Sequence, residues 1–220
     1  VTSLGSVMLP RVANLLATGD HKAVNKMHEM SFLIYNLVIF PMMAGILIVN
    51  DDFVQFFLGQ DFQDARYAIA IMIFRMFFIG WTNIMGIQIL IPHNQNKEFM
   101  ISTTAPAIIS VGLNLLFLPK LGYIGAAIVS VSTEALVWVI QLYFTRRYLK
   151  EVPIIGSLTK IVLASAIMYG LLLVSKTVIH FSPTINVLAF AVIGGIIYLF
   201  AILSLKVVDV KELKQIIRKN

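Results

Sequence analysis

The chain has 220 residues, of which 59% are hydrophobic, and its mean hydropathy of +0.88 is far above that of a water-soluble domain. A soluble core is therefore excluded. The formal net charge of +6 does not indicate nucleic-acid binding, because basic residues gather in the cytoplasmic loops of membrane proteins. The chain has no cysteine, so it forms neither a disulfide framework nor a thiolate metal site.

Residues 1–9 form an apolar stretch that is too short to cross a bilayer and lacks the basic start of a signal peptide. We expect the end of a helix that begins before Val1, so that the chain is the C-terminal part of a larger transporter. The alternative is a complete protein with a re-entrant or interfacial N-terminus. Residues 10–30 are mixed and basic, and a turn is predicted at residues 18–20, which is typical of a cytoplasmic linker.

Long runs without charge predict six membrane-spanning helices, because about 20 apolar residues cross the ~30 Å hydrocarbon layer. Residues 30–50, 76–96 and 99–119 carry no charged side chain, and residues 121–145 carry only Glu134. A shorter run becomes long enough if Lys160 and Lys176 extend to the two interfaces. The expected spans are residues 31–49, 67–91, 99–118, 123–144, 158–175 and 185–205.

The basic residues predict the orientation, since Lys and Arg beside short loops stay in the cytoplasm. With six spans, 13 of the 17 Lys and Arg residues fall on one side, which we assign to the cytoplasm together with the C-terminus. The opposite side holds only Arg66, Lys120 and Lys176, and Arg75 lies within a span. The sequence therefore predicts a multi-pass membrane protein with its C-terminus in the cytoplasm.

Two segments outside the spans are predicted to lie at the membrane surface. Residues 51–65 place four phenylalanines among acidic residues, which favours a short amphipathic helix at the outer interface. Residues 206–220 combine apolar positions at helical spacing with basic residues that suit anionic lipid headgroups. A solvated tail without a lipid role is the alternative for this second segment.

Polar residues inside a bilayer normally face the interior of the bundle or an aqueous cavity, so their spacing indicates which helices line a site. One row follows every fourth residue of the third span, and a second row follows the fourth span. The second span has a broad polar face, and the first span contributes Asn36. The two final spans look peripheral, with a small-residue pair for packing at Ala191 and Gly195. The three polar sets are Ser102, Pro106, Ser110 and Asn114; Gly122, Ala126, Ser130 and Glu134; and Arg75, Thr82, Asn83 and Gly86.

Arg75 and Glu134 are the two charged residues expected within spans. An arginine at mid-membrane costs roughly 2.5–3.5 kcal/mol, so it either faces a cavity and binds substrate phosphate or extends about 12 Å to the outer interface. Glu134 lies at the centre of its span and cannot reach an interface. It either carries a coupling proton or ties two helices together as a neutral, hydrogen-bonded group. Pairing between Arg75 and Glu134 is the remaining possibility.

Other chemistries find no support in the sequence. The four histidines do not have metal-ligand spacing, and we assign His21 and His28 to the cytoplasmic linker, His93 to a loop and His180 to the outside. No phosphate-binding loop is present. We therefore expect no cofactor, no metal and no enzymatic activity, and any uphill transport needs an ion gradient, a partner ATPase or downhill flow of substrate.

Several blocks resemble bacterial polysaccharide flippases of the Wzx type, which belong to the multidrug, oligosaccharidyl-lipid and polysaccharide exporter superfamily. The blocks are residues 4–11 with Gly19 and Asp20, residues 53–59 with Phe62, and residues 118–127 with Thr133 and Glu134. The similarity covers residues 1–150. The resemblance implies an all-helical bundle in the bacterial cytoplasmic membrane, with a MATE-like C-terminal lobe at residues 1–150. Hydropathy predicts the two peripheral spans within residues 151–205, and the spacing of apolar and basic residues predicts the basic tail at residues 206–220.

The same resemblance implies that undecaprenyl-pyrophosphate-linked oligosaccharide units move from the inner to the outer leaflet by alternating access. Within it, Arg75 is the candidate phosphate contact, Asn83, Ser110 and Asn114 are candidate cavity groups, and Glu134 is the candidate ion-coupling residue. Expected partners are the lipid-linked substrate, membrane lipids and other polysaccharide assembly proteins. The alternatives are a cation-coupled multidrug exporter and a lipid-linked peptidoglycan-precursor flippase. A membrane-embedded glycosyltransferase is disfavoured, because the external loop is short.

Overall fold

The computed structural model describes residues 2–178 and 182–207, with side chains from Met8 onward. The regular structure of this part is entirely helical, which confirms the predicted fold class. The elements in chain order are α1 (Thr2–Ala17), α2 (His21–Phe57), the 3-10 helix η1 (Gln60–Phe62), α3 (Ala65–Asn83), the π-helix η2 (Ile84–Leu90), α4 (Asn96–Leu149), α5 (Ile154–Val178) and α6 (Pro183–Ser204).

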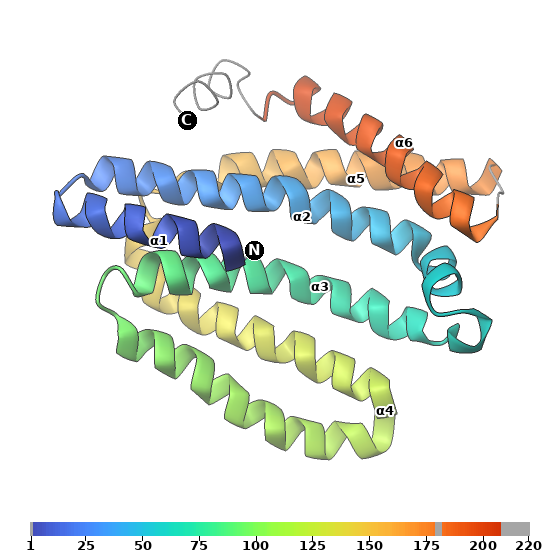
Figure 1. Ribbon diagram of the computed structural model, residues 1–220, viewed down its shortest axis with the longest axis horizontal. Helices are drawn as coiled ribbons and strands as arrows, with labels where there is room; N and C mark the ends of the chain where they lie inside the picture. The colour runs from blue at the N-terminus through green and yellow to red at the C-terminus, as the bar shows by residue number, and fades with distance from the viewer. Residues whose placement is uncertain (1, 179–181, 208–220) are drawn as a thin grey trace. The chain divides into compact units, whose positions relative to one another are not determined.

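Five helical segments of the described chain are long and apolar enough to cross a membrane, and α4 accounts for two of the six predicted spans. A continuous helix of 54 residues would be about 80 Å long, more than twice the hydrocarbon thickness. Gly122 breaks α4 with φ 56° and ψ −138°. Figure 1 shows the result, in which α4 folds back as two arms that run side by side. The protein is therefore a multi-pass membrane protein.

The segments on either side of the first span are more helical than the sequence analysis expected. The predicted turn is present at residues 18–20, where Gly19 has φ 74° and the Asp20 carboxylate accepts a hydrogen bond from the Ala23 N–H at 3.0 Å. This cap starts α2 at His21, so the expected linker belongs mainly to α1 and α2. At its other end α2 continues to Phe57 instead of giving way to a separate interfacial helix. In the predicted tail, only Lys206 and Val207 lie within the described residues.

The chain divides into two compact units, each built from segments that are separated in sequence. Unit 1 comprises Val1–Tyr35 and Asp64–Ile154, and unit 2 comprises Asn36–Gln63 and Ile155–Asn220. In unit 1, α3 packs along α4, while η2 contacts α1, α3 and α4. Its core includes Phe32, Met85 and Leu90, all at most 1% exposed. The ring of Tyr35 lies directly against Gly80, a contact that leaves no room for a larger residue there.

Unit 2 combines the second half of α2 with α5 and α6. Gly194 of α6 allows close packing, since a Cβ atom there would lie 3.0 Å from a methyl carbon of Leu172 on α5. One end of the unit is tied by polar contacts: Lys176 Nζ lies 3.4 Å from the Asp52 carboxylate, which also accepts a hydrogen bond from Asn186 at 2.9 Å. Lys176 therefore reaches an acidic partner at the end of α2 as it extends beyond its own span.

Candidate functional site

The two charged residues expected at mid-membrane form an ion pair in unit 1. Arg75 Nη2 lies 2.9 Å from Glu134 Oε1, and the two side chains are 37% and 21% exposed. The pair joins α3 to the second arm of α4, the two elements that pack together most extensively in this unit. Each charge therefore has the opposite charge as its neighbour, which offsets part of the cost of placing it within a span.

Only part of the Arg75 guanidinium is occupied by this contact. A guanidinium has five N–H donors, and Glu134 is reached through Nη2. The Arg75 Nε is buried and has no hydrogen-bond partner among the described residues. Arg75 thus keeps donor capacity for a second oxyanion while its charge is held by Glu134.

Aromatic rings lie one helical turn along from the ion pair. Phe78 follows Arg75 by three residues on α3, and Trp138 follows Glu134 by four on α4, so each ring shares a helix face with its charged neighbour. The ring centroids of Phe78 and Trp138 are 5.8 Å apart, and those of Trp81 and Trp138 are 6.2 Å apart. The aromatic packing therefore joins α3 to the second arm of α4 beside the ion pair.

The remaining predicted site residues occupy the same unit without joining the ion pair directly. Ser110 and Asn114 are half-buried on the first arm of α4, and each donates to a carbonyl of its own helix, at 2.8 and 2.9 Å respectively. Asn83 ends α3, eight residues or about 12 Å beyond Arg75 along the helix. Its Oδ1 is buried and accepts no hydrogen bond from any described residue. Asn83, one of the predicted cavity residues, therefore keeps a side-chain oxygen that can accept a hydrogen bond.

A buried polar network in unit 1 was missed by the sequence analysis. The Ser31 hydroxyl donates to Gln88 Oε1 at 2.7 Å, and the His28 ring Nε2 bonds the Gln88 carbonyl at 3.1 Å. His28 was assigned to a solvated linker, yet it is 1% exposed because α2 begins seven residues earlier and packs it against η2. A second buried contact joins the two arms of α4, where Gln141 Nε2 donates to Ser102 Oγ at 3.2 Å.

The sequence did contain a signal for this network. Gln88 and Gln141 are each a lone amide within an apolar run, which is the same kind of signal that selected Asn114. Gln88 also lies in the π-helix η2, a geometry that occurs mostly as single turns and often at functional positions. The close contact of η2 with α4 depends on Gly86, where a Cβ atom would lie 2.6 Å from the Phe99 ring.

A polar cavity of about 290 Å³ lies at the end of unit 1 that carries Arg147. We call it the histidine pocket. Its lining comes from the start of α2, the loop between η2 and α4, and the end of α4 with the turn that follows. The lining residues are His21, Val24, Asn25, His28, His93, Arg147, Tyr148 and Glu151.

The loop between η2 and α4 contributes one titratable residue to the pocket, His93. Burial lowers the pKa of His93 below its usual value of 6.5, and the nearby charges of Arg147 and His21 lower it further. A hydrogen bond of 2.7 Å between His93 Nδ1 and the Ile89 carbonyl opposes this shift. The neutral imidazole is therefore favoured at neutral pH.

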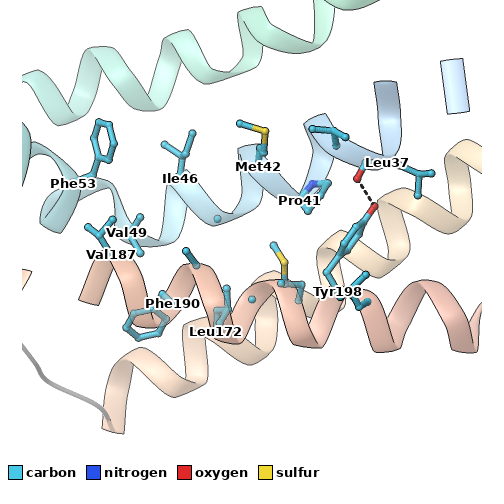
Figure 2. Close-up of a pocket in the computed structure, with 17 residues that line it drawn as sticks. Leu37, Pro41, Met42, Ile46, Val49, Phe53, Leu172, Val187, Phe190 and Tyr198 are labelled. Atoms are coloured by element: carbon cyan, nitrogen blue, oxygen red, sulfur yellow. Dashed lines mark hydrogen bonds between the residues drawn. The ribbon is translucent and has the colours of Figure 1, made fainter. Parts of the chain in front are cut away.

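Unit 2 contains an apolar groove of about 520 Å³ between α2, α5 and α6 (Figure 2). Its side chains are almost all hydrocarbon, and they include Pro41, Phe53 and Phe190. The Tyr198 hydroxyl donates to the Leu37 carbonyl at 2.9 Å. Gly195, expected as a packing residue, faces open space in the groove, whereas the neighbouring Gly194 makes the helix contact. The groove is suited to a hydrocarbon chain.

Among the described residues, no group of three or more His, Asp or Glu side chains is placed to hold a metal ion. The comparisons with known proteins point to transport. The family model described as "Lipid II flippase MurJ" matches residues 1–215. No solved structure matches the chain.

Three curated relatives resemble the chain at low identity. An uncharacterized membrane protein of Methanocaldococcus jannaschii is 25% identical over 99% of this chain and 42% of its own length. A putative O-antigen transporter of Escherichia coli is 28% identical over 62% of this chain and 33% of its own length. The probable low-salt glycan biosynthesis flippase Agl15 of Haloferax volcanii is 20% identical over 98% of this chain and 46% of its own length. The chain thus spans less than half the length of these relatives.

Proposed function

Because the chain belongs to the lipid II flippase MurJ family, we propose that it acts within a flippase that moves a lipid-linked glycan across the membrane. The family is a family of transporters and not of enzymes. The observation that carries the proposal is the family match over residues 1–215 of a chain whose described part is a set of membrane-spanning helices. The putative O-antigen transporter and the glycan flippase among the relatives support a glycan as cargo.

The substrate that we favour is an undecaprenyl-pyrophosphate-linked oligosaccharide, moved from the inner to the outer leaflet. In this proposal Arg75 binds a phosphate oxygen with the N–H groups that Glu134 leaves free, and the guanidinium fork suits such an oxyanion. Asn83, Ser110 and Asn114 supply further polar groups to the transport cavity.

Glu134 controls the availability of Arg75 in this proposal. While Glu134 is ionised, its negative charge offsets the charge of Arg75 and repels a phosphate that approaches the free N–H groups. A proton delivered to Glu134 removes this repulsion, so the guanidinium attracts the substrate phosphate more strongly. Proton binding and substrate binding are thereby coupled through a single ion pair.

The test replaces the charges of this pair in cells that depend on the protein for surface-glycan assembly. We expect Arg75→Ala to abolish surface glycan at normal protein levels, and Arg75→Lys to retain part of it, because lysine keeps the charge but not the fork. Glu134→Gln should remove the pH dependence of transport in vesicles. Arg66→Ala is the matched control, since Arg66 lies at the start of α3, where Nη2 donates to the Tyr67 hydroxyl at 2.9 Å.

Full surface glycan in the Arg75→Ala cells would contradict the phosphate role of Arg75. Retained pH dependence in Glu134→Gln would reduce Glu134 to a tie between helices. An effect of Arg66→Ala equal to that of Arg75→Ala would show a general need for positive charge on α3.

A lipid-linked peptidoglycan precursor is the second candidate substrate, and the description of the matching family favours it. Depletion of the protein distinguishes the two candidates. Loss of surface glycan with an intact cell wall supports the oligosaccharide substrate, whereas precursor accumulation followed by lysis supports the peptidoglycan precursor. Altered drug resistance with both polymers unchanged would point instead to a multidrug exporter.

A further inference from the structure

The histidine pocket is separate from the Arg75–Glu134 pair. Arg147 follows Glu134 by 13 residues on α4, which corresponds to about 20 Å along the helix. The pocket volume of about 290 Å³ is at the lower end of the range for ligand sites, roughly 300–1,000 Å³. This size suits one sugar or glycerol unit better than a whole oligosaccharide.

His28 lines this pocket and carries an unused hydrogen-bonding atom. The side chain is 1% exposed, and its Nδ1 is buried without a hydrogen-bond partner among the described residues. The Nε2 bonds the Gln88 carbonyl, which can only accept, so Nε2 carries the proton. In the neutral ring Nδ1 is therefore a lone pair, and it needs a donor such as a hydroxyl group.

Two other residues that line the pocket, His93 and Glu151, also offer hydrogen-bond acceptors. His93 Nδ1 bonds the Ile89 carbonyl, so the neutral ring keeps Nε2 as an acceptor. The Glu151 carboxylate accepts a hydrogen bond from Asn25 Nδ2 at 2.8 Å through Oε2, and this contact leaves lone pairs on both oxygens. The pocket thus offers several acceptors to a ligand that carries several hydroxyl donors.

One cation completes the lining. Arg147 lies over the Tyr148 ring at 4.7 Å, and its Nη2 donates to the Tyr148 hydroxyl at 2.7 Å. The same ring contacts His93, with centroids 4.0 Å apart. The exposed Arg147 therefore contacts the Tyr148 ring beside the acceptors, with donors left for an anionic oxygen.

We propose that the histidine pocket binds a small phosphorylated polyol, whose hydroxyl groups donate to His28, His93 and Glu151 while its phosphate contacts Arg147. Two sources present this chemistry: the sugar phosphate of a lipid-linked glycan and the glycerol phosphate headgroup of a membrane lipid. The site is a binding site in its own right and does not depend on the direction or substrate of transport.

The experiment measures binding to the full-length protein in phosphatidylcholine nanodiscs at neutral pH by saturation-transfer NMR. The observed probes are glucose 1-phosphate and glycerol 3-phosphate, and the binding of inorganic phosphate, which has no carbon-bound protons, is measured by its competition with them. We expect His28→Gln to weaken glucose 1-phosphate binding roughly tenfold, because the glutamine amide keeps an N–H for the Gln88 carbonyl but has no acceptor at the ring position of Nδ1. Arg147→Gln should weaken binding to a similar degree.

Arg146→Gln is the matched control, because Arg146 is the adjacent exposed arginine and lies over Tyr143 outside the pocket. Its binding should equal that of the unchanged protein, and melting curves should show that all variants remain folded. Tighter binding of glucose 1-phosphate assigns the site to the glycan, and tighter binding of glycerol 3-phosphate assigns it to the lipid headgroup. Equal binding of inorganic phosphate, no binding of either polyol phosphate, or equal losses in the Arg146 and Arg147 variants would overturn the proposal.

Discussion

Arg75 and Glu134 form an ion pair, so each residue offsets the cost of placing the other charge within a membrane span. Either charge alone within a span costs several kcal/mol, and removal of one partner leaves the other unpaired. The pair ties α3 to the second arm of α4, and it also holds one guanidinium with unused donors in an otherwise apolar region. The free donors are compatible with a phosphate contact, and the proposed role of Arg75 rests on them.

His93 leads to a prediction about pH at the same scale. Its pKa is lowered in the folded protein, mainly by burial, so between that value and 6.5 the unfolded chain binds more protons. Stability should be full above pH 6.5 and should fall as the pH drops below it. The His93→Phe variant, which cannot be protonated, should lose part of this fall in melting temperature measured between pH 8 and pH 5.

The readout is the dependence on pH and not the absolute melting temperature. His93→Phe also loses the hydrogen bond to Ile89, which lowers stability at every pH. An unchanged fall in melting temperature between pH 8 and pH 5 in the variant would show that His93 is not responsible.

At the scale of elements, α4 shows how one glycine makes two spans. Gly122 adopts a positive φ that a residue with a side chain rarely adopts, and the break separates the two arms. Gly125 lies close to the end of the first arm, where a Cβ atom would be 2.6 Å from the Phe117 carbonyl oxygen. The turn therefore depends on backbone freedom at one glycine and on the absence of a side chain at another.

Gly122→Ala should destabilise the protein by roughly 1–3 kcal/mol, because the alanine is forced into a sparsely populated backbone conformation. Gly112→Ala is a matched control on the same element: a Cβ atom there meets nothing within 4 Å, and alanine should stabilise the helix by about 0.5–1 kcal/mol. Chemical unfolding in detergent measures both changes. Equal stability of the two variants would show that the bend does not require glycine at position 122.

At the scale of the whole molecule, each unit is held together by contacts between segments far apart in sequence. Unit 1 places polar pairs within an apolar core, where Ser31 of α2 donates to Gln88 of η2 and Gln141 donates to Ser102 across the two arms of α4. Unit 2 has polar contacts at its ends, where Lys176 meets Asp52 and Lys160 donates to the Lys206 carbonyl at 3.3 Å. In both units these polar contacts join segments that are far apart in sequence.

The predicted topology can be tested because the chain has no cysteine of its own. Single cysteines at the exposed positions Lys150 and Asp61 should react with a membrane-impermeant maleimide from opposite sides. We expect Asp61→Cys to be labelled in intact cells and Lys150→Cys only after permeabilisation, because the basic segment stays in the cytoplasm. Labelling of Lys150→Cys in intact cells would reverse the proposed orientation.

The sequence by itself determined the fold class and the approximate spans, because an apolar run of sufficient length has few alternatives to a helix in a bilayer. It also singled out Arg75 and Glu134, since charges within such runs are rare. It could not decide whether Arg75 extends to the interface or pairs with Glu134, because the two residues are 59 positions apart.

Only the tertiary structure decided that question, together with the burial of His28 and the polar network around Gln88. His28 looks like a residue of a solvated basic linker, and only the packing of α2 against η2 encloses it. Hydropathy records the average surroundings of a segment, whereas hydrogen bonds between helices depend on the rotation and register with which the helices pack. Local sequence specifies the hydropathy of a segment, and contacts between distant segments specify the hydrogen bonds between helices.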